Sequence, residues 1–296
     1  MINNYINNKL FIFVLCIPFL LQAQERKKGL LEQIVSPKVS FQTTYMDRSS
    51  VKNSQGDVQV NKNSIKINNA NLSFSYTNWQ FDWNNVADLP FGDKINQPIE
   101  KMHSLSLGIT KPYRINKRWF SLSSASLNAT FEDTLSDSYN LGLFSFASYA
   151  INADHSLQMG FFGTYHPVKT LALPIMSYSY RARSRDGIQV ILGFPRTHVG
   201  YHINQNTLIR FGATASNSLI RLSDTSTIEQ EGYSKFEDYM VNLGVSYDYS
   251  QKIKLTGDLL YTVQRDFTIY NKDGDEMSNY EMEPAKGVML KVIFQL

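Results

Sequence analysis

Five histidines and several acidic residues are the side chains of this sequence that could bind a metal ion. His198 and His202 are four residues apart, a spacing that brings two side chains together on a helix but holds them about 13 Å apart on a strand. Residues 271–275 carry oxygen ligands at the alternate positions of a calcium loop, but Gly274 comes two places too early for that loop. We therefore expect no metal site and no cofactor.

The sequence also lacks a spacing that would pair a catalytic nucleophile with a base. His103 and Ser104 are direct neighbours, as are Asp154 and His155, so the two side chains of each pair point to opposite faces of a strand. A histidine and a serine two residues apart would share one face, and no such pair occurs. We predict that the protein is not an enzyme.

Charged side chains in alternating segments are the remaining candidates for a functional site. In residues 287–296 every second residue is apolar, and Lys291 and Gln295 have the opposite parity. An extended strand there would have one wholly apolar face and one polar face. The same parity in other segments predicts a polar lumen with these lumen-facing charges: Asp82, Arg181, Arg183, Arg210, Asp248, Lys254, Asp258 and Lys291.

Alternating segments recur from Pro37 to the C-terminus, and the connections between them are long and short in turn. This pattern predicts an all-β fold, an antiparallel up-and-down transmembrane β-barrel of about 14 strands, or 12 if residues 188–203 form one irregular strand. We expect one of the short turns at Thr77 and Asn78, after a bulge in residues 68–71.

Aromatic residues beside the predicted short turns indicate where the barrel would meet the surface of a membrane. Tryptophan and tyrosine concentrate at that interface because one end of each ring is apolar and the other is polar. The predicted aromatic girdle consists of Trp79, Trp119, Tyr201, Tyr247 and Tyr249.

The N-terminus has the features of a secretory signal. Lys9 precedes an apolar core in residues 10–21, and Ala23 precedes a plausible cleavage site. We expect a signal peptide in residues 1–23, a periplasmic lead-in in residues 24–36 and the barrel in residues 37–296. Cys16 is the only cysteine and lies inside the signal, so disulfide and thiol chemistry are excluded from the mature chain.

The composition excludes two further classes of protein. A formal net charge of +3, scattered along the chain, is too small to indicate a nucleic-acid partner. No segment approaches the roughly 18 uninterrupted apolar residues of a membrane-spanning helix. The expected partners are outer-membrane lipid and the barrel insertion machinery, with a small solute as the candidate cargo.

Residues from about 131 to 220 resemble an uncharacterised outer-membrane β-barrel family of Gram-negative bacteria that is defined as a domain of unknown function. The resemblance implies a barrel fold and a location in the outer membrane, and brings no activity with it. In one departure, Phe294 is third from the end and Leu296 is last, whereas such barrels usually end on an aromatic residue that the insertion machinery recognises. The motifs that carry the resemblance are Gly160, Gly163, Tyr165, His166, Pro167, Pro174, Tyr178, Ser179, Tyr180, Gly193, Phe194, Pro195, Gly200, Tyr201, His202, Ile203 and Asn204.

Three functions are open from the sequence. The first is passive or facilitated passage of small polar solutes through a slightly cationic lumen. The second is a structural or surface-interaction barrel whose lumen is packed with paired charges. The third is a soluble periplasmic β-sandwich that binds a ligand, in which the apolar faces would pack against each other.

Overall fold

The computed structural model describes residues 36–166, 168–181, 186–194 and 196–296. The predicted signal peptide, and the lead-in as far as residue 35, lie outside the described residues. None of the helices in the described segments is long and apolar enough to cross a membrane. The strands are β1 (Lys38–Ser50), β2 (Asp57–Asn69), β3 (Leu72–Asn84), β4 (Lys101–Arg114), β5 (Trp119–Phe131), β6 (Tyr139–Ala150), β7 (His155–Tyr165), β8 (Leu171–Arg181), β9 (Gly187–Phe194), β10 (Arg196–Asn204), β11 (Thr207–Arg221), β12 (Tyr233–Asp248), β13 (Ile253–Tyr270), β14 (Glu276–Met282) and β15 (Lys286–Gln295).

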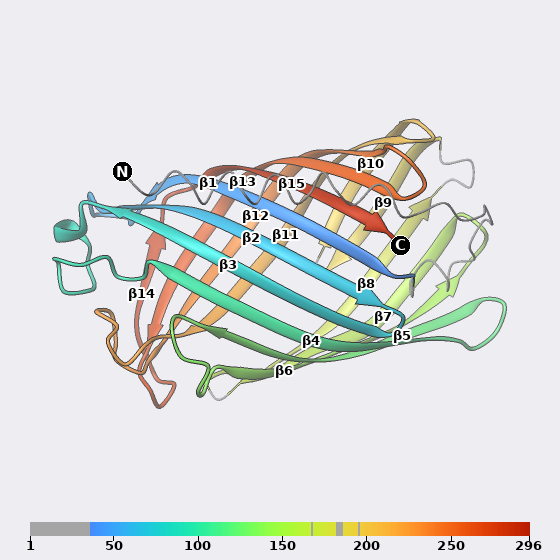
Figure 1. The fold of residues 1–296 in the computed structure, drawn as a ribbon. Helices are drawn as coiled ribbons and strands as arrows, with labels where there is room; N and C mark the ends of the chain where they lie inside the picture. Colours follow the sequence, from blue (N-terminus) through green and yellow to red (C-terminus); the bar gives the residue numbers. More distant parts are fainter. Residues whose placement is uncertain (1–35, 167, 182–185, 195) are drawn as a thin grey trace.

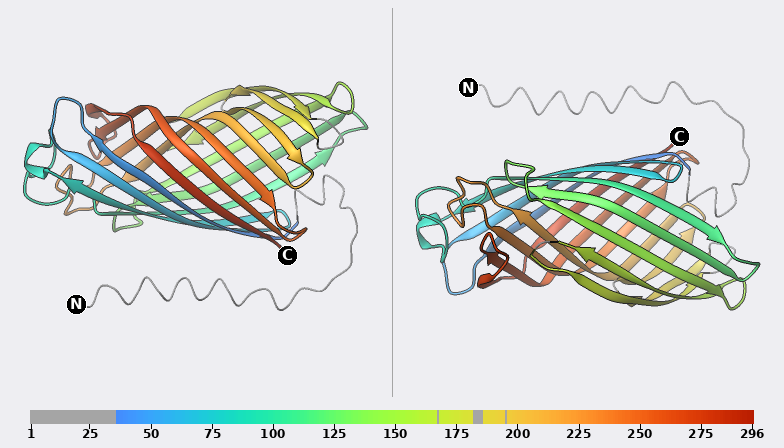
Figure 2. Two further views of the ribbon diagram at one scale, coloured as in Figure 1. Left: turned by 90° about the horizontal axis from the view of Figure 1, so that it is seen from above. Right: turned by 90° about the horizontal axis from the view of Figure 1, so that it is seen from below.

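The strands form a closed antiparallel barrel (Figures 1 and 2). Strands β1 to β13 pair in sequence order, and the wall closes where β15 pairs with both β13 and β1. β14 pairs with the outer end of β13 and makes an isolated bridge from Met282 to Val51, outside the ring of the other strands, so the wall itself has 14 strands. The predicted fold class is confirmed. Since β9 and β10 are separate strands, the count of 14 holds and the alternative of 12 is wrong.

The two ends of the barrel differ in the length of their connections. Long connections, including the one that holds the short helix η2 (Val86–Asp88), lie at the end with β14, and the C-terminus lies at the opposite end with the short turns (Figure 1). In barrels of this type the long loops face outward and the short turns face the periplasm. We refer to these as the outer end and the periplasmic end.

The predicted turn at Thr77 and Asn78 is wrong. β2 and β3 pair without a break from Asp57 and Asn84 down to Asn69 and Leu72, and the chain turns at Ala70 and Asn71. Ala70 takes a positive φ of 51°, as tight turns between strands require. The change of apolar parity near this point therefore reflects the hairpin turn, and the predicted bulge is not present.

The outer surface of the barrel carries the apolar faces of the alternating segments. Leu107, Leu259 and Leu290 are 58%, 60% and 56% exposed, although they lie in the middle of regular strands. Such faces are stable only against hydrocarbon, because a soluble sandwich would bury them against a second sheet. The predicted alternative of a soluble β-sandwich is therefore wrong.

A cluster of buried apolar side chains, here called the cap, fills the lumen at the outer end. Phe81 of β3 contacts Phe236 of β12, with ring centroids 5.3 Å apart, although several strands of the wall separate β3 from β12. Phe236 in turn packs on Phe267 of β13 at 4.6 Å. The loop between β3 and β4 folds over this core and buries Leu89 and Ile99 completely. The cap therefore joins opposite walls of the barrel across its interior.

The barrel narrows at a seam between β5 and β11. β10 pairs with β11 only as far as Thr214, whereas β11 continues to Arg221 and there forms a parallel bridge with Phe131 at the end of β5. The N–H of Glu132 donates to the carbonyl of Arg221 at 3.0 Å. Strands β6 to β10 thus end below the seam, and the remaining strands close a smaller ring around the cap.

His166 packs against this seam from the outer loop between β7 and β8, with its ring 5.3 Å from that of Tyr233. Burial lowers the pKa of His166 from 6.5 to about 4, and its Nδ1 accepts a hydrogen bond from the N–H of Val168 at 3.1 Å.

We expect the outer loops to lose stability as the pH falls from 6.5 toward 4. In that window an unfolded loop binds a proton on His166 that the folded loop excludes, and the stability is fully present above pH 6.5. The hydrogen-exchange protection factors of residues 222–233, which are corrected for the slower intrinsic exchange at low pH, should be lower at about pH 5 than at about pH 7.5. The variant His166→Gln should show a smaller difference between the two, and an equal difference in both proteins would contradict this role.

Candidate functional site

The lumen is polar below the cap, and an ion pair marks its periplasmic rim. Lys254 of β13 lies 3.5 Å from Asp248 of β12, on directly paired positions of the two strands. Both side chains are partly exposed, at 42% and 35%, so water screens their attraction. The partial exposure of both side chains indicates that water reaches the periplasmic end of the lumen.

A buried charge network lies one level further in. Arg210 donates from Nη2 to both carboxylate oxygens of Asp258, at 2.7 and 2.6 Å, and from Nη1 to Ser246 at 2.8 Å. Asn242 also donates to Asp258 at 3.2 Å. The side chain of Asp258 is 1% exposed, so its charge depends on these donors and not on water. The network ties β11, β12 and β13 together inside the barrel.

Gly244 makes room for this network. It lies opposite both Arg210 and Asp258 in the sheet, and a Cβ at this position would collide with the carboxylate of Asp258. We expect Gly244→Ala to lower the free energy of unfolding by about 1–3 kcal/mol, because the carboxylate must leave its place or the strands must shift. Urea unfolding in lipid vesicles measures the loss. The matched variant Gly257→Ala, whose Cβ would meet only ordinary contacts, should be close to wild type, and equal losses would contradict the argument.

A second charged level lies directly under the cap. Lys62 places its ammonium group 4.2 Å from the ring of Trp79, and Arg265 lies 3.0 Å from Asp238 without being aligned as a hydrogen bond. None of these three charged residues was predicted from the sequence. Alternation with the buried Val58 and Val60 could have identified Lys62, but a register shift between β12 and β13 hides the parity of Arg265.

The structure brings together most of the predicted lumen charges. Arg210, Asp248, Lys254, Asp258 and Lys291 lie on the inner face of β11, β12, β13 and β15. Arg181 has inward parity at the periplasmic end of β8, where its N–H donates to the carbonyl of Asp154. Arg183 lies outside the described residues.

The prediction that Asp82 faces the lumen is wrong. Asp82 shares the parity of Leu72, Phe74 and Tyr76, which face outward on β3, and it forms an ion pair with Arg48 on the outer surface. Above Tyr76 the strand leaves the membrane, so its outward side chains become polar and its apolar ones turn inward to form the cap.

The same exchange of faces corrects the predicted girdle at one position. Trp79 is 8% exposed and belongs to the cap, so its assignment to the girdle is wrong. Trp119 packs on Tyr149 at 5.0 Å on the outer surface. Tyr201, Tyr247 and Tyr249 are exposed beside short turns at the periplasmic end, and their role at the membrane interface remains a prediction.

The histidines of β10 are not gathered into a metal site. His198 and His202 both have inward parity, opposite Gly212 and Leu208 of β11 respectively. Within the described segments no group of three or more histidine, cysteine or acidic residues lies close enough to hold a metal ion.

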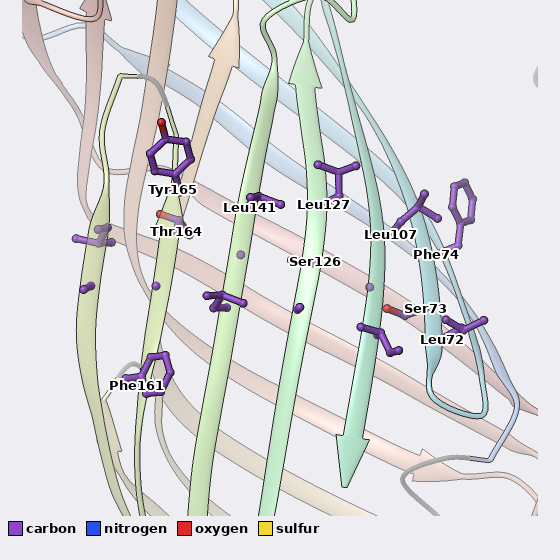
Figure 3. A pocket seen from close by; sticks show the side chains of 18 of the residues that line it. Leu72, Ser73, Phe74, Leu107, Ser126, Leu127, Leu141, Phe161, Thr164 and Tyr165 are labelled. Carbon is purple, nitrogen blue, oxygen red and sulfur yellow. The ribbon is translucent and has the colours of Figure 1, made fainter.

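A hollow of about 940 Å³ lies on the outer surface across β2 to β8 (Figure 3). Exposed apolar side chains such as Leu107, Leu141 and Phe161 line it, and Gly163 leaves space beside Phe161. Its apolar lining and its place in the outward apolar belt suit hydrocarbon and exclude a polar solute. The hollow was not predicted from the sequence, because no periodic pattern encodes the curvature of the wall.

Comparisons with known proteins do not assign this chain to a family. No family model and no curated protein matches the chain. Among solved structures, the outer membrane protein Omp33 of Acinetobacter baumannii is 10% identical with a TM-score of 0.40, and the match covers 88% of this chain and 98% of Omp33. The NanC porin is 10% identical with a TM-score of 0.38, covering 87% and 100%. The toluene transporter TodX of Pseudomonas putida is 5% identical with a TM-score of 0.39, covering 88% and 90%.

The location follows from the chain itself, because a closed antiparallel wall with an apolar outer belt satisfies every condition for crossing a membrane with strands. The protein is an outer-membrane β-barrel.

Proposed function

We propose that the barrel passes small polar solutes between the periplasmic end and the outside, and that the cap is the gate of this passage. The observation that carries the proposal is that Lys66 and Arg196 are exposed although their positions point into the lumen. Charged side chains inside a barrel are exposed only where water surrounds them, so the lower lumen is hydrated.

The cap holds the passage closed in this conformation. Its aromatic contacts cross the lumen from β3 to β12 and β13, and Trp83 donates from Nε1 to the carbonyl of Ile99 at 2.9 Å, which fixes the loop between β3 and β4 over the core. A solute can pass only when this loop and the rings below it move. The hydrogen bond and the buried rings define which parts must move.

The second candidate function is a structural or surface-interaction barrel without passage. The cap itself favours it, because a dry apolar core at the outer end gives the wall stability that an open pore would lack. The hydrogen bonds of Asp258 with Arg210 and Asn242 also favour it, because charges in a packed lumen must be paired with partners inside the protein.

Conductance in planar bilayers tests the proposal. We expect the wild-type protein to be mostly closed, and a variant in which a short Gly-Ser linker replaces residues 86–99 to show stepwise current, because that loop covers the core. A matched replacement of the exposed hairpin tip 272–274 should behave as wild type. Silence of both the wild-type protein and the loop variant, with correct insertion, would overturn the passage and favour the structural barrel.

A further inference from the structure

The charges inside the lumen do not balance. The carboxylates Asp238, Asp248 and Asp258 are each engaged by one cation, namely Arg265, Lys254 and Arg210. Among the residues that the structure describes, Lys66, Lys291 and Arg196 are further cations with inward parity that make no ion pair. We call these three the cation cluster.

The members of the cluster come from different parts of the wall and converge. Ser40 on β1 pairs with Lys66 of β2, and Gln42, two residues further along β1, pairs with Lys291 of β15, so one strand and an offset of two residues separate the two lysines in the wall. Arg196 lies on the inward face of β10, opposite Thr214 of β11, and its charge and that of Lys66 both act on the ammonium group of Lys291. The cluster therefore surrounds a common space within the lumen.

Nearby acceptors are already committed. Asp258 attracts Lys291, but its two oxygens accept hydrogen bonds from Arg210 and Asn242. Like charges held together inside a barrel raise the energy of the folded state unless a counter-ion lies between them, because the low-dielectric wall weakens screening. Lysine and arginine donors from several sides are the groups that proteins use to hold oxyanions.

We propose that the cation cluster is a binding site for a small oxyanion with at least two negative charges, such as a phosphate or a compound with two carboxylates. Lys66 and Arg196 supply exposed donors, and Lys291 supplies a half-buried charge at the wall. As a claim about which solutes the barrel carries, the proposal rests on the proposed passage. As a claim about a binding site, it does not depend on the passage.

Calorimetric titration of the purified, folded barrel with inorganic pyrophosphate tests the site. We expect saturable binding that weakens at least tenfold in the variant Lys66→Met with Lys291→Met, which keeps the length and most of the apolar stem of both side chains. The control Lys111→Met removes the same charge from an exposed outward position of β4 and should bind as wild type. Thermal unfolding of each variant confirms that the barrel is folded.

The results separate the site from the passage. Absence of saturable pyrophosphate binding in the wild type, or equal affinity in the wild type and the double variant, overturns the site even if the protein conducts. Binding that depends on the two lysines in a protein that never conducts keeps the site and overturns the passage.

Discussion

Phe267→Ala is expected to lower the free energy of unfolding by about 3–5 kcal/mol, the range for removing a fully buried phenylalanine. Phe267 has no exposed surface, and its ring contacts Phe236 at 4.6 Å and Phe91 at 5.0 Å. The variant leaves a cavity in the cap that the fixed wall cannot close, and the outer end of the lumen loosens. Urea unfolding in vesicles measures the stability, and bilayer recording should show more frequent openings.

Leu259→Ala is the matched control for Phe267→Ala, because Leu259 lies on the same strand and is 60% exposed on the outward face. We expect it to cost about 1 kcal/mol or less and to leave the current unchanged. Equal losses in the two variants would mean that the cap contributes no more than the outer surface does.

Asp258→Ala is expected to destabilise the barrel by about 3–5 kcal/mol, as for other buried charges left without a partner. Arg210 would lose both of its bonds to the carboxylate and keep the bond that it donates to Ser246. Replacing both residues by methionine should recover most of the loss, because an apolar pair requires no compensating charge. The measurement is the free energy of unfolding of Asp258→Ala, of the single variants Arg210→Met and Asp258→Met, and of the double methionine variant.

The rim pair supplies the comparison for Asp258→Ala. Lys254→Met breaks an ion pair of which both members are partly exposed, and it should cost about 1 kcal/mol or less. If the effects of Arg210→Met and Asp258→Met simply added in the double variant, the network would not be coupled, and the central role of Asp258 would be lost.

The barrel could be predicted from the sequence because one rule applies at every strand, namely that the residues facing lipid are apolar and occupy alternate positions. Apolar residues recur at every second position in segments such as β15, and the connections alternate in length, so strand number and direction follow without any knowledge of contacts. The predicted inward parity of Arg210 and Asp258 also follows from local alternation, which is why the sequence located both ends of the central ion pair.

The cap could not be predicted by the same rule. In β3 the apolar positions change from the outward face at Tyr76 to the inward face at Trp79 without any change in the strand, because only the surroundings change from hydrocarbon to water. Reading both sets as outward places a false turn between them and misassigns Trp79 and Asp82. The cation cluster is likewise invisible in the sequence, because β2, β10 and β15 are brought together only by closure of the wall.

The aromatic contact between Phe81 and Phe236 has a consequence for how the protein assembles. The strands that carry these rings lie on either side of the junction between the first strand and the last, so the contact forms only after that junction has closed. Until then Phe81 and Trp83 are exposed to water on a growing sheet, and they favour aggregation. The contact between Phe81 and Phe236 therefore forms only in a fully closed barrel. A chain truncated before β15 cannot bury Phe81 and Trp83 in this way.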